Sequence, residues 1–213
     1  MPTRQANARF PLILLAIYAV FWIALAIKPL DREDWLLENA LVFITIPLLV
    51  LTYRNLRFSN FSYALLFVFF VLHEVGAHYT YAKVPYDQWF QALTGNTLNS
   101  VFGFTRNHYD RVIHFSYGLL MVPPTLELLR AKNAEGSGIW RFIVPLFFLH
   151  CQAGIFEMIE WVAAEVFGGD LGVAYLGTQG DVWDAHKDMA LAGLGTIIGL
   201  IVMMTVGRKW GRQ

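Results

Sequence analysis

Histidines and acidic residues recur at helical spacing inside otherwise apolar stretches of this 213-residue chain. Asp110 and His114 are four residues apart, as are Asp184 and Asp188, so each pair shares one face of a helix. Charged side chains at membrane depth are costly and usually mark a functional site. Imidazole and carboxylate groups together suit zinc, iron or manganese, and carboxylate-rich sets also suit magnesium. The spacing therefore predicts a divalent-metal site, although the sequence does not distinguish among these four metals.

The candidate residues come from four apolar stretches and divide into two predicted roles. The predicted metal ligands are His78, Asp110, His114, Glu157, Asp184 and Asp188. The predicted catalytic acids or bases are His73, Glu74 and Glu160. A carboxyl group buried beside other acids holds its proton more tightly, which suits it to proton transfer in catalysis. Arg111 and Lys187 are expected to neutralise part of this acidic set.

Simpler interpretations of these groups stay open. Asp110 and His114 could form only a hydrogen-bonded pair along one helix. Glu157 and Glu160 could be interfacial carboxylates that face water. Asp181 could cap the last helix, since acidic residues favour helix N-termini.

Six apolar runs must position these residues. They occupy about residues 10–28, 34–53, 58–80, 108–130, 139–167 and 181–207. A helix needs about 20 predominantly apolar residues to cross a bilayer, and most connections between the runs are short. We therefore predict an all-α, polytopic membrane protein, a bundle of six transmembrane helices that forms one domain over residues 1–213. Gly195 and Gly199 have the spacing of a motif for close helix packing.

Composition excludes several other classes of protein. Sixteen Lys+Arg and sixteen Asp+Glu give a formal net charge of zero, so the chain lacks the basic excess that nucleic-acid binding needs. The single cysteine excludes an intramolecular disulfide framework. Charged residues make up 15% of the chain, against about 25% in soluble domains, which again favours a membrane protein.

The distribution of Lys and Arg predicts the orientation in the membrane. More of these residues fall in the terminal segments and even-numbered loops than in the odd-numbered loops, which places both termini in the cytoplasm. The polar ends of the last four runs then meet at the outer side, and we predict one shared, outward-facing polar cavity there. In the outer loop 81–107, the segment YDQWFQALTG (86–95) is either an amphipathic interfacial helix or an ordinary loop.

Four stretches of the sequence also carry a resemblance to a known family. They are HEVGAHYTY (73–81), YDRVIHFSYG (109–118), FEMIEW (156–161) and QGDVWDAHKDMALAGLG (179–195). With them, nearly the whole chain resembles the YjdF-like family of uncharacterised bacterial inner-membrane proteins, which contain a domain of unknown function. The resemblance implies a multi-pass protein of the bacterial inner (cytoplasmic) membrane and supplies no activity.

A fainter resemblance is to the VanZ-like membrane proteins. The matching positions are the pairs Asp110/His114, Glu157/Glu160 and Asp184/Asp188. The last polar residue of that family's final helix is an amide, where Asp188 stands here. The VanZ-like proteins are linked to glycopeptide resistance at the cell envelope, so this resemblance implies a connection with envelope lipids or their precursors.

Three hypotheses about function follow. In the first, the chain is a metal-dependent integral membrane hydrolase whose amphiphilic, lipid or lipid-linked substrate reacts at the outer leaflet. In the second, the same cluster binds or transports a cation, a proton or a small solute. In the third, the chain is a structural or accessory membrane protein with a hydrated vestibule. The expected partners are membrane lipid and a lipid-like substrate, nucleic acid is not expected, and a homo-oligomer stays open.

Overall fold

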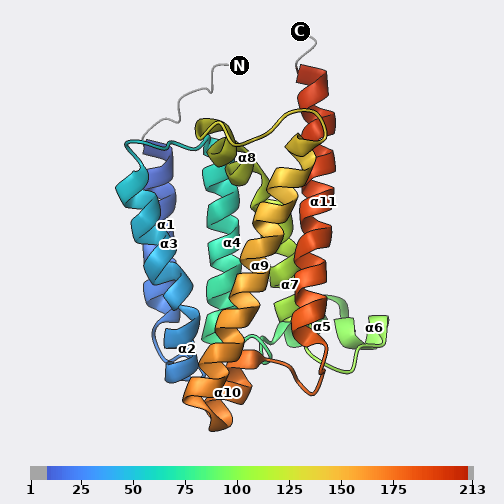
Figure 1. The fold of residues 1–213 in the computed structure, drawn as a ribbon. Helices are drawn as coiled ribbons and strands as arrows, with labels where there is room; N and C mark the ends of the chain where they lie inside the picture. Colours follow the sequence, from blue (N-terminus) through green and yellow to red (C-terminus); the bar gives the residue numbers. More distant parts are fainter. Residues whose placement is uncertain (1–8, 211–213) are drawn as a thin grey trace.

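The structure, a computed structural model, describes residues 9–210, and these fold into helices and the turns that join them (Figure 1). The helices are α1 (Arg9–Leu25), α2 (Arg32–Glu38), α3 (Ala40–Thr52), α4 (Asn60–His78), α5 (Tyr86–Thr94), α6 (Leu98–Phe102), α7 (Tyr109–Leu120), α8 (Val122–Ala131), α9 (Trp140–Phe167), α10 (Gly169–Leu176) and α11 (Asp184–Trp210). The predicted domain also includes residues 1–8 and 211–213, which lie outside the described residues.

The described helices have the length and surface of a membrane bundle. Five segments are long and apolar enough to cross a membrane, namely Arg32–Thr52, Asn60–His78, Tyr109–Ala131, Trp140–Phe167 and Asp184–Thr205, and α1 is a shorter apolar helix. Large apolar side chains such as Val20 and Leu51 are exposed on the outside of the bundle, as a lipid-facing surface requires. The prediction of an all-α membrane protein is confirmed, whereas the count of six spans and the orientation stay predictions.

Two of the predicted spans contain a break between helices. The second is interrupted at Asn39, between α2 and α3, and the fourth at Met121, between α7 and α8. Pro123 and Pro124 occupy the first turn of α8, where a missing N–H group is tolerated but where the preceding helix cannot continue unbroken. Each of these two spans therefore consists of two consecutive helices.

The connections contain helices of their own. The segment Tyr86–Thr94 is helical, as one of its two interpretations predicted. Helix α10 was not predicted, because its glycine-rich segment reads as a loop. Gly168 and Gly169 have φ values of 61° and 55°, a conformation that glycine adopts readily, and so the chain reverses there before α10 begins. α5, α6 and α10 lie at one end of the bundle, called the polar end below, and α1 begins and α11 ends at the opposite end (Figure 1).

Helices α7 and α11 approach each other closely through glycines. A Cβ atom on Gly118 would collide with the backbone of Ala192, and one on Gly195 would collide with the backbone of Phe115. Gly199 likewise faces the Leu119 carbonyl at close range. The packing role predicted for Gly195 and Gly199 is therefore confirmed.

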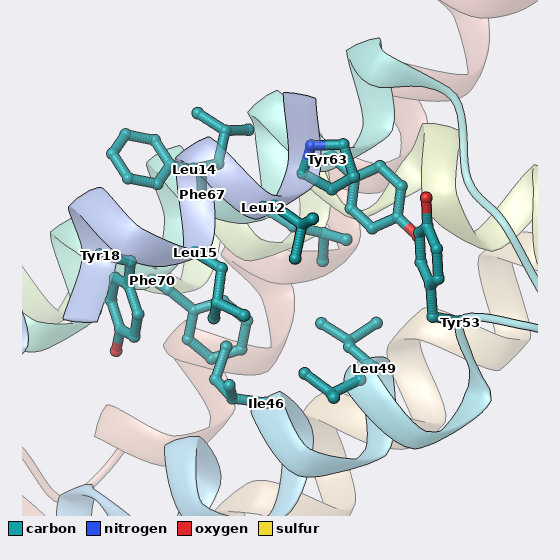
Figure 2. Close-up of a pocket in the computed structure, with 13 residues that line it drawn as sticks. Leu12, Leu14, Leu15, Tyr18, Ile46, Leu49, Tyr53, Tyr63, Phe67 and Phe70 are labelled. Carbon is teal, nitrogen blue, oxygen red and sulfur yellow. The ribbon is translucent and has the colours of Figure 1, made fainter. Parts of the chain in front are cut away.

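An apolar cavity of about 190 Å³ lies between α1, α3 and α4 (Figure 2). Its lining is aromatic and aliphatic, and Leu15, Ile46 and Phe70 contribute to it from the three helices. Tyr18, Tyr53 and Tyr63 also line it, and Figure 2 shows their phenol rings. No acidic or histidine side chain lines it, so its chemistry differs from that of the cavity near the candidate site.

Alanine at Gly118 or at Gly195 is expected to destabilise the fold. The added methyl group must displace backbone of the facing helix, and overpacking of this kind costs about 1–3 kcal/mol. The measurement is the unfolding free energy of each variant in mixed detergent micelles.

Gly154→Ala is the matched control, because its Cβ would meet only the Met189 sulfur, at an ordinary 3.5 Å. Alanine also favours a helix over glycine by about 1 kcal/mol, so this variant should equal or exceed the wild-type stability. Wild-type stability of Gly118→Ala and Gly195→Ala would contradict the close approach of α7 and α11.

Candidate metal centre at the polar end of the bundle

The glycine contacts set the register that brings the candidate ligands together. α7 and α11 both begin at the polar end and run in the same direction (Figure 1). With Gly118 against Ala192 and Gly195 against Phe115, the first turns of the two helices lie side by side. Their inward-facing acids therefore meet.

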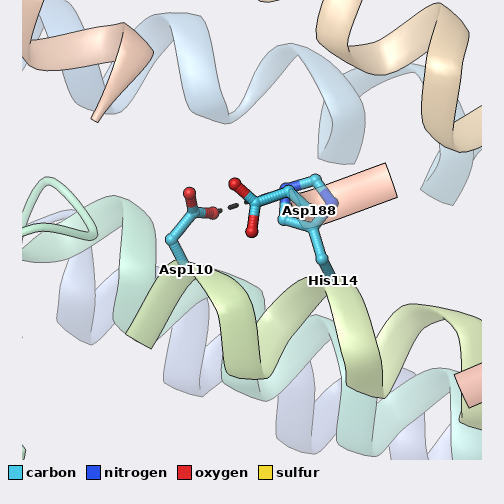
Figure 3. Close-up of side chains that lie close together, drawn as sticks. All are labelled: Asp110, His114 and Asp188. Carbon is cyan, nitrogen blue, oxygen red and sulfur yellow. Dashed lines mark ion pairs between the residues drawn. The ribbon is translucent and has the colours of Figure 1, made fainter. Parts of the chain in front are cut away.

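Four side chains from α7, α9 and α11 form the candidate centre, called the His114 cluster. One ligand atom each of Asp110, His114 and Asp188 lies within 4.8 Å of the other two (Figure 3). The His114 Nε2 atom is 3.4 Å from Asp110 Oδ1 and 3.4 Å from Glu157 Oε1. The structure thus brings together four of the six predicted ligands.

The His114 cluster is enclosed and incompletely hydrogen-bonded. His114 is 7% exposed and Asp188 is 2% exposed. Asp188 Oδ1 and Glu157 Oε1 have no hydrogen-bond partner among the described residues. An unpaired buried polar atom costs about 1–3 kcal/mol, and a charged one costs more. A protonated His114 would offset only one of the three carboxylates, so the cluster has both the free oxygens and the charge to hold a cation.

Asp184, the fifth predicted ligand, is instead held by two arginines. Arg106 Nη1 and Nη2 donate to its two oxygens at 2.7 and 3.1 Å, and Arg111 Nη2 donates to Oδ1 at 3.0 Å. Both carboxylate oxygens are therefore occupied by charge-assisted hydrogen bonds. The neutralising role predicted for Arg111 is confirmed, but Arg106 was not anticipated because it lies in the loop before α7.

Asp181 belongs to the same group of ion pairs. Its Oδ2 accepts from Lys187 Nζ at 2.6 Å and from Arg111 Nη2 at 2.5 Å, and its Oδ1 accepts the Trp183 N–H at 3.1 Å. The Lys187 ammonium, followed by the Trp183 N–H, holds the pKa of Asp181 well below its usual range. Its stabilising contribution is therefore present above the unfolded pKa of about 3.9 and is lost only in stronger acid.

His78, the sixth predicted ligand, lies apart from the His114 cluster. Its Nδ1 is 2.7 Å from the carbonyl oxygen of Leu25 at the end of α1. The four-residue spacing places His78 on the same face of α4 as Glu74. Glu74 in turn contacts α2, since its Oε1 accepts from Trp35 Nε1 at 2.9 Å. Both residues tie α4 to the first two helices of the chain.

The predicted catalytic residue His73 has both ring nitrogens engaged. Its Nε2 is 3.2 Å from the Glu38 carbonyl oxygen, which can only accept, so this nitrogen carries the proton. Its Nδ1 therefore accepts from the Tyr81 hydroxyl group. His73 is fully enclosed and connects α2, α4 and the loop after α4.

Two buried acids of α2 were missed by the sequence reasoning. Asp34 and Glu38 are 0% and 4% exposed, and both Asp34 oxygens and Glu38 Oε2 lack hydrogen-bond partners among the described residues. α10 packs on both α2 and α9, and burial, followed by the nearby carboxylates of Glu38, Glu160 and Asp34, raises the pKa of Tyr175 in α10. The signal available in the sequence was the four-residue spacing of Asp34 and Glu38 at the start of an apolar run.

A cavity of about 320 Å³ opens beside the His114 cluster. Asp110, His114 and Glu160 line one part of it, and Glu160 is itself 9% exposed. Most of the remaining lining is apolar and comes from α3, α4, α7, α8 and α9. The sequence predicted a shared polar cavity, but this cavity is polar only beside the His114 cluster and is mainly apolar elsewhere.

Comparisons with known proteins add a family match. The profile of a family described as "Predicted membrane protein (DUF2238)" matches residues 10–209. A curated protein of Escherichia coli (strain K12), named "Inner membrane protein YjdF", is 35% identical over 174 residues, which cover 81% of this chain and 78% of that protein. No solved structure matches the chain.

Loss of Arg111 is expected to destabilise the fold through Asp184. In Arg111→Gln, the buried Asp184 keeps only Arg106, and the loss of a hydrogen bond to a charged group costs about 1.5–3 kcal/mol. Lys187→Gln is the control, because Lys187 is largely exposed and exposed pairs contribute little. Thermal midpoints in detergent measure both, and equal midpoints for the two variants would contradict the buried character of the Arg111–Asp184 pair.

Proposed function

The chain belongs to the DUF2238 family of predicted membrane proteins, and we propose from the geometry of the His114 cluster that it is a metal-dependent membrane hydrolase acting on an amphiphilic substrate. The sequence-based resemblance to YjdF-like proteins is confirmed by this membership, and the resemblance to VanZ-like proteins stays a prediction. The observation that carries the proposal is the convergence of Asp110, His114 and Asp188 within 4.8 Å beside a largely apolar cavity.

The donor set fits a divalent transition metal. One imidazole with carboxylate oxygens suits zinc, iron or manganese, and magnesium would favour an all-oxygen shell. Glu157 would complete a four-residue set through Oε1, which accepts no hydrogen bond from the described residues. When bound, such an ion lowers the pKa of a coordinated water and polarises a phosphoryl or acyl oxygen.

Glu160 is the proposed general acid or base. It follows Glu157 by three residues on α9, lines the same cavity as His114 and is nearly enclosed. It can therefore reach a substrate that approaches the His114 cluster from the cavity. Glu74 and His73 support this role less well, since their hydrogen bonds to Trp35, Tyr81 and the Glu38 carbonyl hold them in structural positions.

The proposed location is the bacterial inner membrane, with both termini cytoplasmic. The curated relative is named an inner membrane protein, and the Lys and Arg distribution predicts the orientation. Since α1 begins at the end opposite to the His114 cluster (Figure 1), this orientation would put the cluster at the level of the outer leaflet. The head group of a lipid or lipid-linked substrate would meet it there.

The purified protein is expected to bind about one divalent metal ion per chain, as measured by elemental analysis after detergent extraction. Asp110→Asn, His114→Ala and Asp188→Asn should each lose most of it. His78→Ala is the matched histidine control and should retain the ion, because His78 bonds to the Leu25 carbonyl rather than to the cluster. A metal-free wild type, or metal loss in His78→Ala and not in His114→Ala, would refute this assignment.

The buried acids of α2 favour a second candidate, the binding or transport of a cation or proton. Asp34 and Glu38 add two buried acids on α2, and α10 packs on both α2 and α9. Transport also needs a route toward the opposite end, where the cavity lining is mostly apolar. His150 of α9 is exposed and does not line this cavity.

Proteoliposomes separate the two candidates. For a hydrolase, wild-type vesicles should show the same proton and divalent-cation flux as protein-free vesicles, measured with entrapped indicator dyes. Flux above that background, abolished by Glu157→Gln, would favour transport and displace the hydrolase proposal.

A further inference from the structure

We propose that the cavity beside the His114 cluster is a tube for a single long hydrocarbon chain, which enters from the bilayer between α3 and α9 while its head group lies at the cluster. This inference rests on the proposed function for the reaction at the head group. The occupant is a lipid with one long chain available for insertion, rather than a soluble ester or phosphate.

The lining has a polar end and a mainly apolar length. His73, Tyr81, Asp110, His114 and Glu160 form the polar end. Beyond them, the wall consists mainly of aliphatic and aromatic side chains from five helices. In the middle, the Tyr117 hydroxyl donates to Gln152 Oε1 at 2.8 Å, so this polar pair is satisfied without an added partner. A ligand that matches the lining has one polar end and a long apolar body.

The lining of the cavity extends along most of α7 and α8. Along α7 and α8 its lining recurs on one face, at Asp110, His114, Tyr117, Met121 and Leu128. At a rise of 1.5 Å per residue, this stretch extends about 27 Å, close to the roughly 30 Å thickness of a bilayer hydrocarbon core. A volume of about 320 Å³ spread over that length leaves no room for two chains side by side.

The side between α3 and α9 gives access from the membrane. Thr45 and Leu49 of α3 and Gln152 and Phe156 of α9 line the same cavity, yet these two helices do not pack extensively against each other within residues 9–210. α3 instead packs on α2, whereas α9 packs on α8, α10 and α11. Gln152 is both a lining residue and exposed at the surface, so the cavity reaches the lipid-facing surface there.

The physics of the bilayer makes chain entry inexpensive. Lipid tails are as apolar as the leucine and phenylalanine side chains of the wall, so a chain that moves from lipid into the tube exchanges one apolar surrounding for another. Affinity must then come from packing and from the head group at the His114 cluster. The tube therefore selects by chain length and width.

A photoreactive palmitate analogue with a diazirine at its methyl end tests this inference in nanodiscs. Labelled peptides are mapped by mass spectrometry. The wild type should be labelled around Phe58 and Leu128, which line the cavity far from the cluster. Thr45→Trp should fill the tube and lower that labelling about tenfold, equivalent to an overpacking cost of about 1.4 kcal/mol.

The neighbouring substitution Ile44→Trp is the matched control, since Ile44 is 68% exposed on the outside of α3. It should leave the labelling unchanged. Leu128→Phe, a milder change at the far end, should shift preference from the palmitate probe to a decanoate probe. Labelling confined to the outer surface, or equal in Thr45→Trp and Ile44→Trp, would overturn the inference.

Metal content, measured on the same samples, separates this inference from the proposed function. Displacement of the probe by Thr45→Trp in a protein that binds no metal would support the chain tube while the hydrolase proposal fails. Retained metal with no displacement would overturn the tube and leave the metal centre standing. Metal retained in Thr45→Trp also shows that the variant is folded.

Discussion

Carboxyl groups enclosed at one end of the bundle impose a constraint on everything around them, because they cannot all be charged in a low-dielectric interior without compensating cations. Arg106 and Arg111 form ion pairs with Asp184. Arg111 and Lys187 form ion pairs with Asp181. The carboxylates of Asp188 and Glu157 each keep an oxygen that accepts no hydrogen bond from the described residues. A protonated His114 would offset only one of the three carboxylates in the His114 cluster. A bound metal ion would compensate the remaining negative charge.

The rest of the architecture follows from the need to hold these groups at that end. Glycines let α7 and α11 approach until their first turns are adjacent, which places Asp188 beside Asp110 and His114. The arginine pairs tie the loop before α7 to the start of α11. His73 and Glu74 then join α4 to α2 through hydrogen bonds. The cluster and the apolar cavity beside it are therefore parts of one arrangement in which a polar head and an apolar chain can be held together.

Helical periodicity predicted much of this arrangement. The four-residue spacing of Asp110 and His114 and the apolar runs around them led to the correct helices and to most of the cluster. Periodicity shows which residues share a face of one helix, but it does not show which neighbouring helix that face meets. His78 was therefore grouped with the cluster although it faces α1. The pairing of Arg106 with Asp184 was not predicted, because it joins segments that are distant in the sequence.

The acids of α2 show a different limit. Asp34 and Glu38 lie at the start of an apolar run, where charged residues usually face water. Their burial depends on α10, which packs on α2. The glycine-rich segment that forms α10 has no helical pattern in the sequence.

X-ray absorption spectroscopy of the zinc-loaded protein would test the central claim most directly. The account predicts one imidazole nitrogen among oxygen ligands at about 2.0–2.2 Å, with the imidazole signal lost in His114→Gln. An imidazole signal that persists in that variant, or an all-oxygen shell in the wild type, would contradict it.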